Sequence, residues 1–96
     1  MKSPIEIIEI LNKILKENEP FRTELIDDFQ NDFFNDESVR DEALEMIVGD
    51  IAYDLDFYEP NEEWRKQDSS FYGNEKLEEI IKQGIIKIEN YNKAFE

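Results

Sequence analysis

The chain has 96 residues, a formal net charge of −14, and neither cysteine nor histidine. This composition excludes disulfide bonds, thiolate metal sites and any mechanism in which histidine is the acid, base or ligand. Hydrophobic residues make up 40% and aromatic residues 12% of the chain, enough to form a core despite 38% charged residues. A chain of this length holds one core, so we expect a single helical domain over residues 1–96.

The acidic charge is concentrated in the middle of the chain. Residues 17–63 hold 17 acidic residues against two basic ones, Arg22 and Arg40, whereas residues 1–16 and 64–96 are nearly balanced. A field of this sign repels nucleic acid and anionic membranes and attracts a basic protein. The segment MKSPIEIIEI lacks the pattern of a signal peptide, and no apolar stretch is long enough to cross a bilayer. We therefore expect a cytoplasmic protein with no nucleic-acid or membrane partner.

Helical periodicity begins near residue 4 and predicts two helices in the first third of the chain. Ser3 and Glu6 match a capping box with proline at the first helical position, and the pattern ends before Pro20. A second helix is expected from about Thr23, with Arg22 close to its apolar side. That side holds Leu25, Ile26, Phe29 and Phe33, and the other side holds Glu24, Asp27, Asp28, Asn31 and Asn35.

A third helix is expected to begin near Ser38, which resembles a cap, and a fourth to follow Gly73. Residues 59–73 show no period and contain Pro, Ser and Gly, so they predict a loop. Gly84 lies in the apolar stripe of the last helix, where it permits close helix approach. The fold class is therefore expected to be all-α, as a small antiparallel four-helix bundle with a long loop before the last helix. The apolar stripe of the third predicted helix consists of Leu44, Ile47, Val48, Ile51, Ala52 and Leu55. That of the fourth consists of Leu77, Ile80, Ile81, Ile85 and Ile88.

The sequence lacks the parts of a catalytic or metal site. It has no glycine-rich phosphate loop, and a small bundle offers little cleft for carboxylates to hydrolyse a sugar chain. Asp54, Asp56 and Tyr58 imitate the opening of an EF-hand, but Glu59 and Arg65 stand where glycine and glutamate are needed. We expect no enzyme, no cofactor and no dedicated metal site.

The second predicted helix has an acidic side with no basic residue in it. A solvated helix face usually mixes both signs, whereas like charges one turn apart repel and aspartate is a poor helix former. This arrangement favours a binding surface over a merely solvated one. The residues concerned are Glu24, Asp27, Asp28, Asp32 and Asp36.

The third predicted helix carries a second apolar side opposite its stripe. Met46, Asp50, Tyr53 and Phe57 follow the spacing i, i+4, i+7, i+11. Either the helix is packed on two sides, or this side is an exposed patch in which aromatic rings serve as anchors. We expect burial of Met46 and partial exposure of Tyr53 and Phe57, and we leave Phe34 undecided.

The predicted loop EPNEEWRKQDSSFYG is long for so small a domain. Its aromatic residues, Trp64 and Phe71–Tyr72, either fold back as a lid on the bundle or stay exposed. Its acidic residues Glu59, Glu62 and Glu63 are candidates to extend the acidic surface.

The run IAYDLDFYEPNEEWRKQDSSFYGNEKLEEIIKQGIIKIENY resembles the C-terminal half of colicin-D-type bacterial immunity proteins, over residues 44–92. In that family a helix ends in an aromatic, acidic and proline segment, a polar loop follows, and a Leu-Glu-Glu helix closes the bundle. The first 40 residues match only in helix count and acidity. The resemblance implies a small acidic helical bundle that binds a cognate nuclease toxin, often one that cleaves tRNA. Contact-dependent inhibition systems use similar immunity proteins.

Charge and helical spacing, not the family, provide the candidate binding residues. We expect an immunity protein that covers the cationic cleft of a basic nuclease toxin, as a monomer or weak homodimer. The alternatives are an acidic nucleic-acid mimic or adaptor that binds another basic host protein, and a small structural bundle without a basic partner. The expected toxin-binding residues are Asp27, Asp28, Asp32, Asp50, Tyr53, Asp54, Asp56, Phe57, Tyr58 and Glu59.

Overall fold

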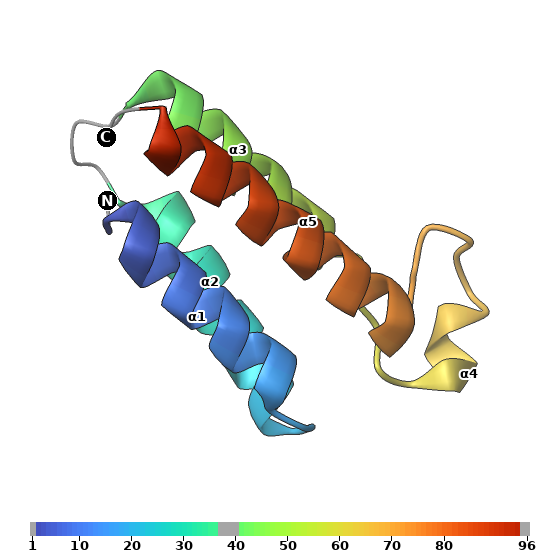
Figure 1. Cartoon of the computed structure of the whole chain (residues 1–96). Coiled ribbons are helices and arrows are strands. Elements are labelled where there is room, and N and C mark those ends of the chain that lie inside the picture. The colour runs from blue at the N-terminus through green and yellow to red at the C-terminus, as the bar shows by residue number, and fades with distance from the viewer. Residues whose placement is uncertain (1, 37–40, 95–96) are drawn as a thin grey trace.

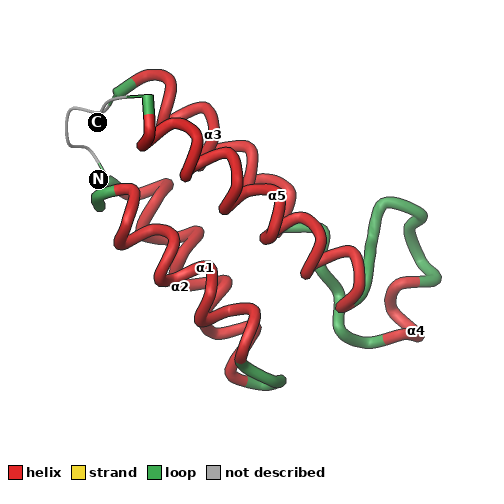
Figure 2. Tube along the Cα trace, in the orientation of Figure 1, coloured by secondary structure: helices red, strands yellow, loops and turns green. Residues whose placement is uncertain are grey.

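The computed structural model describes residues 2–36 and 41–94, and all regular structure in these two stretches is helical. The helices are α1 (Pro4–Lys16), α2 (Phe21–Asn35), α3 (Glu42–Leu55), α4 (Glu62–Arg65) and α5 (Asn74–Lys93) (Figure 1). The four long helices lie along one another, and α4 lies beyond them at one end (Figure 2). The expected all-α class is therefore confirmed for the described residues.

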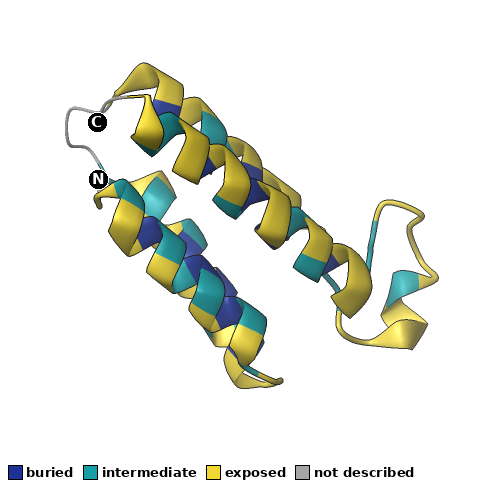
Figure 3. Cartoon of the chain, viewed as in Figure 1, coloured by how far each residue is buried: buried dark blue, intermediate teal, exposed yellow. Residues whose placement is uncertain are grey.

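Each long helix packs against two others. α1 contacts α2 and α5, and α3 contacts the same two helices. Figure 3 shows buried segments along the four long helices, whereas α4 contributes no buried residue. The core consists of Ile7, Leu11, Ile14, Ile26, Phe29, Leu44, Val48, Ile51, Ala52, Leu55, Leu77, Ile81 and Ile88.

The predicted capping box at the start of α1 is confirmed. The Ser3 hydroxyl accepts from the Glu6 amide at 3.3 Å, and the Ser3 amide donates to the Glu6 carboxylate at 3.2 Å. These bonds from Ser3 hold the pKa of the Glu6 carboxyl below its usual value. The sequence alone therefore sets where α1 begins.

α2 begins at Phe21, two residues earlier than predicted, and Arg22 in its first turn is buried. The Arg22 guanidinium donates to the carbonyls of Ile14 at 3.0 Å and Leu15 at 2.8 Å, and to the Asn74 side-chain oxygen at 3.0 Å. Ile14 and Leu15 lie in the last turn of α1, where carbonyls lack helical partners and the helix dipole favours a cation. Arg22 therefore joins the end of α1 to the start of α5.

α3 begins at Glu42 rather than near Ser38, which lies outside the described residues, so the predicted helix start is wrong. Its cap is Asp41, whose carboxylate accepts from the Leu44 amide at 3.1 Å. Aspartate is as good a cap as serine, and only Asp41 stands immediately before the helical residues.

The expected close approach at Gly84 is confirmed. A Cβ atom at this position would lie 2.6 Å from Cδ1 of Ile51, which is closer than carbon atoms approach without displacement. The missing side chain thus lets α5 pack directly on the core side of α3.

The connection between α3 and α5 is closed at its base, where the Glu59 amide donates to the Tyr72 carbonyl at 2.9 Å and the Tyr72 amide to the Phe57 carbonyl at 3.1 Å. The expectation of a plain loop is wrong, because one helical turn, α4, forms where the Asn61 side chain caps the amides of Glu63 and Trp64. The lid expectation holds only for Tyr72, which packs against the core, since Trp64 is 58% exposed.

Candidate functional surface

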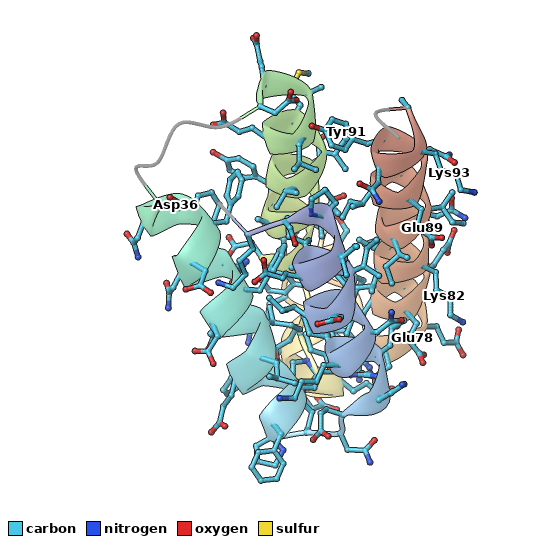
Figure 4. All side chains as sticks on the ribbon, turned by 60° about the vertical axis from the view of Figure 1, so that its left-hand side comes forward. Asp36, Glu78, Lys82, Glu89, Tyr91 and Lys93 are labelled. Carbon is cyan, nitrogen blue, oxygen red and sulfur yellow. The ribbon has the colours of Figure 1, made fainter. Side chains whose placement is uncertain are left out.

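Charge divides the four long helices into two contacting pairs. α2 and α3 contact each other and carry eight acidic residues and one basic residue, the buried Arg22. α1 and α5 also contact each other and carry six acidic and six basic residues. Figure 4 shows the mixed signs on α5, where Glu78, Lys82, Glu89 and Lys93 point away from the other helices. Folding therefore gathers a net acidic charge on the α2–α3 half, whereas the helices of the α1–α5 half are balanced.

The second apolar side of α3 is exposed. Met46 and Tyr53 are each 66% exposed and Phe57 is 42% exposed. The predicted burial of Met46 is wrong, because α3 packs only on α2 and α5 among the described helices and nothing described covers the opposite side. We call this exposed side, made of Met46, Asp50, Tyr53 and Phe57, the α3 ridge. It presents large apolar groups beside a carboxylate, as expected for a binding surface.

Aromatic rings continue from the α3 ridge onto α2. The Phe34 ring lies edge-on to Tyr53 with 5.5 Å between centroids, and edge-on to Phe33 at 5.4 Å. Phe34 is 51% exposed, while Phe33 packs against the core. Gln30 fixes the two helices by donating to the Ala52 carbonyl at 3.0 Å. The seam between α2 and α3 therefore holds its rings in fixed positions, with Phe34 and Tyr53 open to a partner.

The three predicted aspartates of α2 do not share one side of the helix. Asp27 is two turns from Phe34 and so lies on the side toward α3. Asp28 is exposed and lies about 100° further round the helix. Asp32 faces the segment that precedes α1 instead, where its carboxylate pairs with the Lys2 ammonium at 2.7 Å and raises the pKa of Lys2. The structure thus groups Asp27 with the aromatic seam and leaves Asp32 compensated.

Asp50 and Asp54 lie one turn apart and line an open groove of about 520 Å³ between α3 and α5. The opposite wall carries Lys76 and Lys87 of α5. No ion pair crosses this groove within the described part of the chain. Asp50 is therefore the part of the α3 ridge that faces away from Phe34, and Asp54 borders the ridge on that side.

Of the predicted binding residues that follow α3, Tyr58 and Glu59 have a structural role and Asp56 does not. Asp56 is the exposed C-cap residue of α3. The Tyr58 hydroxyl lies 2.7 Å from the Asn74 side-chain oxygen and 3.0 Å from the Glu19 carboxylate, so its single hydrogen can serve either acceptor. Burial, together with the Glu19 carboxylate, raises the pKa of Tyr58 to about 12. Glu59 is half-buried and its carboxylate accepts from the Asn61 amide at 3.1 Å. Tyr58 and Glu59 thus fasten the end of the bundle, whereas Asp56 is free to face a partner.

Two features of this surface were missed by the sequence reasoning. The pairing of Lys2 with Asp32 joins residues 30 positions apart, and no local pattern indicates it. The α3–α5 groove was also missed, although Lys76 and Lys87 are spaced three helical turns apart and so share one side of α5. That spacing was the available signal.

The described residues include no group of three or more histidine, cysteine, aspartate or glutamate side chains positioned to hold a metal ion. Within the same residues, none of the helices combines the length and apolar character needed to span a bilayer. Searches of protein-family models, curated proteins and solved structures found no match for this chain.

Proposed function

We propose that this chain is an immunity protein that binds a basic nuclease toxin, of the kind that cleaves tRNA, in the cytoplasm and occludes its active site. The observation that carries the proposal is the contact between α2 and α3, which places eight acidic residues and exposed aromatic rings on one half of the molecule. A nuclease active site is basic because it holds phosphates, so an ordered set of carboxylates is attracted by the same potential.

The carboxylates of the α2–α3 half speed the encounter with a basic toxin and orient the two proteins. Complementary charge raises association rates from about 10⁵–10⁶ M⁻¹s⁻¹ toward 10⁸ M⁻¹s⁻¹ or more at low salt. Asp27, Asp28 and Asp56 are exposed and make no ion pair with another described residue. No described cation therefore occupies these carboxylates before a cationic partner binds, whereas Asp32 is already paired with Lys2.

The exposed aromatic rings lengthen the lifetime of the complex with the toxin. Tyr53, Phe57 and Phe34 are large and exposed on the same half of the molecule as these carboxylates, and the edge-on contact of Phe34 with Tyr53 fixes both rings before binding. Rigid aromatic anchors lose little conformational entropy on binding and often carry most of the energy of an interface. Inhibition in this account is steric and electrostatic, and this chain performs no chemistry.

We further propose that the scaffold is an antiparallel four-helix bundle. This is supported by the cyclic contacts of α1, α2, α3 and α5, and by the backbone bonds between residues 57–59 and 72 that bring the end of α3 to the start of α5. Such a scaffold holds the α3 ridge and the aromatic seam on rigid helices, which favours pre-organised binding.

The proposal is tested by growth rescue. The protein encoded immediately upstream is expressed as the candidate toxin, together with this chain or with a variant carrying Asp27→Lys and Asp28→Lys. Wild type should restore growth, and the variant should lose rescue because reversal of a desolvated charge pair costs about 2–5 kcal/mol, thirtyfold or more in affinity.

The matched control carries Glu78→Lys and Glu89→Lys on α5, which changes the net charge equally on the balanced half. It should rescue as well as wild type. Equal rescue by both folded variants would contradict the assigned surface. If the wild-type chain bound a basic DNA-binding or RNA-binding protein but rescued no toxin, the alternative function, an acidic nucleic-acid mimic or adaptor, would replace this one.

A further inference from the structure

We propose that the groove between α3 and α5 is a self-association surface, in which a second copy of this chain binds through the same groove about a two-fold axis parallel to the helices. The proposal uses a different side of α3 from the aromatic seam and does not depend on the identity of any toxin.

The groove has an apolar floor and two charged walls. Ile47, Ile51 and Ile80 line its floor, and Gly84 removes the side chain that would otherwise separate the helices there. Met46 stands at the rim with 66% of its surface exposed. A flexible thioether beside branched apolar groups adapts readily to a packed partner.

The two walls differ in sign, and this decides how a second copy fits. The α3 wall carries Asp50 and Asp54, and the α5 wall carries Lys76 and Lys87 together with Glu79. A two-fold axis parallel to the helices places the α3 wall of one copy opposite the α5 wall of the other. A two-fold axis across the helices would place aspartates against aspartates. Only the first arrangement is electrostatically favourable, and in a symmetric dimer each of its pairs occurs twice.

Register along the helices also agrees with this arrangement. Ile51 meets Gly84, so these two residues are at one level, and in the antiparallel arrangement Lys87 then lies about half a turn from the level of Asp50. A two-fold axis parallel to the helices preserves levels. It therefore brings Asp50 of one copy within reach of the long Lys87 side chain of the other.

The charge of the groove further favours this surface over others. Its five charged residues sum to −1 in a chain whose net charge is −14. Two copies that meet here keep the acidic side of α2 out of the contact. The remaining long-range repulsion is screened as the Debye length falls from about 30 Å at 0.01 M salt to about 8 Å at 0.15 M.

This screening gives self-association a distinctive salt dependence. Dimerisation should strengthen between these two salt concentrations, because net repulsion is removed before the short-range pairs are lost. Binding of a basic toxin should weaken over the same range. Failure of one proposal is thereby distinguishable from failure of the other. Since the dimer covers Met46 and Asp50 of the α3 ridge and the neighbouring Asp54, it should also compete with a partner that occupies that ridge.

The experiment uses the full chain and two complementary variants. The first carries Asp50→Lys and Asp54→Lys, so that both of its walls are basic. The second carries Lys76→Glu and Lys87→Glu, so that both of its walls are acidic. Sedimentation equilibrium from about 10 µM to about 1 mM at 0.15 M salt covers the weak affinities typical of small interfaces. Circular dichroism confirms that each variant is folded.

Wild type should form dimers in this concentration range, and each variant alone should dimerise at least about tenfold more weakly, since several opposite-charge pairs across the contact become like-charge pairs. A mixture of the two variants should form a heterodimer of nearly wild-type affinity. Three results would each overturn the proposal: a wild-type chain monomeric at about 1 mM, single variants that dimerise as well as wild type, or a mixture that fails to associate.

Discussion

The α2–α3 half and the α1–α5 half of this molecule contribute to the same core but differ in the charge of their outward sides. Each pair places apolar side chains in one shared core, yet the outward sides of α1 and α5 balance acids with lysines, while those of α2 and α3 do not. The α1–α5 half shows that helices of this fold can carry acidic and basic residues in equal number on their outward sides. The repulsion among the acidic residues of α2 and α3 is therefore not required by the fold.

The two halves depend on a joint at one end of the bundle, where Arg22 binds carbonyls of α1 and the side chain of Asn74 at the start of α5. Arg22→Met should break this joint. It removes a buried cation that donates to three acceptors, and it should lower the free energy of unfolding by about 2–4 kcal/mol. Urea denaturation followed by circular dichroism measures the change.

The matched control for that prediction is Lys82→Met, which removes the same charge from the outward side of α5 and should change stability by less than about 0.5 kcal/mol. An Arg22→Met protein as stable as the Lys82→Met protein would show that the joint does not hold the halves together.

The hydroxyl of Tyr58 belongs to the same joint and makes it sensitive to alkaline pH. Its pKa rises to about 12 from the usual value of 10.0, because burial and the Glu19 carboxylate disfavour the phenolate. The protonated form is thus favoured by folding, so this contribution is complete below pH 10 and is lost as the pH rises from about 10 to about 12. Tyr58→Phe should lower stability by about 1 kcal/mol at neutral pH and flatten the alkaline decline.

The decline should not vanish in Tyr58→Phe, because burial also raises the pKa of Tyr72, whose hydroxyl donates to the Asp54 carbonyl. Chemical denaturation at several values above pH 9 separates the two contributions. If the free energy of unfolding of Tyr58→Phe declined at alkaline pH as steeply as that of wild type, ionisation of Tyr58 would not be a cause of the decline.

The smallest expected effects are changes in the free energy of unfolding caused by one charge reversal in each half. They should have opposite signs, and so they compare the two halves directly. Asp28→Lys places a cation one turn from Glu24 and one turn from Asp32, and should raise the free energy of unfolding by about 0.5 kcal/mol. Glu78→Lys instead places a cation one turn from Lys82, and should lower it by a similar amount. Thermal unfolding at low salt measures both. Changes of the same sign would show that the acidic half is not strained by its charge.

Local signals in the sequence predicted much of the fold. Ser3 with Glu6 and the apolar stripe of α5 each lie within a few turns of helix, and the structure confirms the cap, the helix and the close approach at Gly84. The start of α3 was missed because two residues with capping side chains, Ser38 and Asp41, stand three positions apart. The single turn of α4 was missed because a helix of four residues has no period to detect.

Less of the candidate surface was predictable, since it depends on which helices become neighbours. Helical spacing placed Met46 opposite the core stripe, but it cannot say whether another helix covers that side, and the expected burial was wrong. The same limit hid the pairing of Asp32 with Lys2 and the contact of Phe34 with Tyr53. Composition along the chain did predict an acidic middle, which the contact between α2 and α3 turns into one half of the molecule.

The rate of association with the candidate toxin, measured by stopped flow from about 0.01 M to about 0.15 M salt, tests whether the α2–α3 half steers the encounter. If the acidic half steers the encounter, the rate constant should fall steeply with salt, and Asp27→Lys with Asp28→Lys should reduce it about tenfold or more at low salt. Glu78→Lys with Glu89→Lys should leave it within about twofold of wild type. Equal reductions by the two variants, or a rate independent of salt, would contradict the claim that the α2–α3 half is the binding surface.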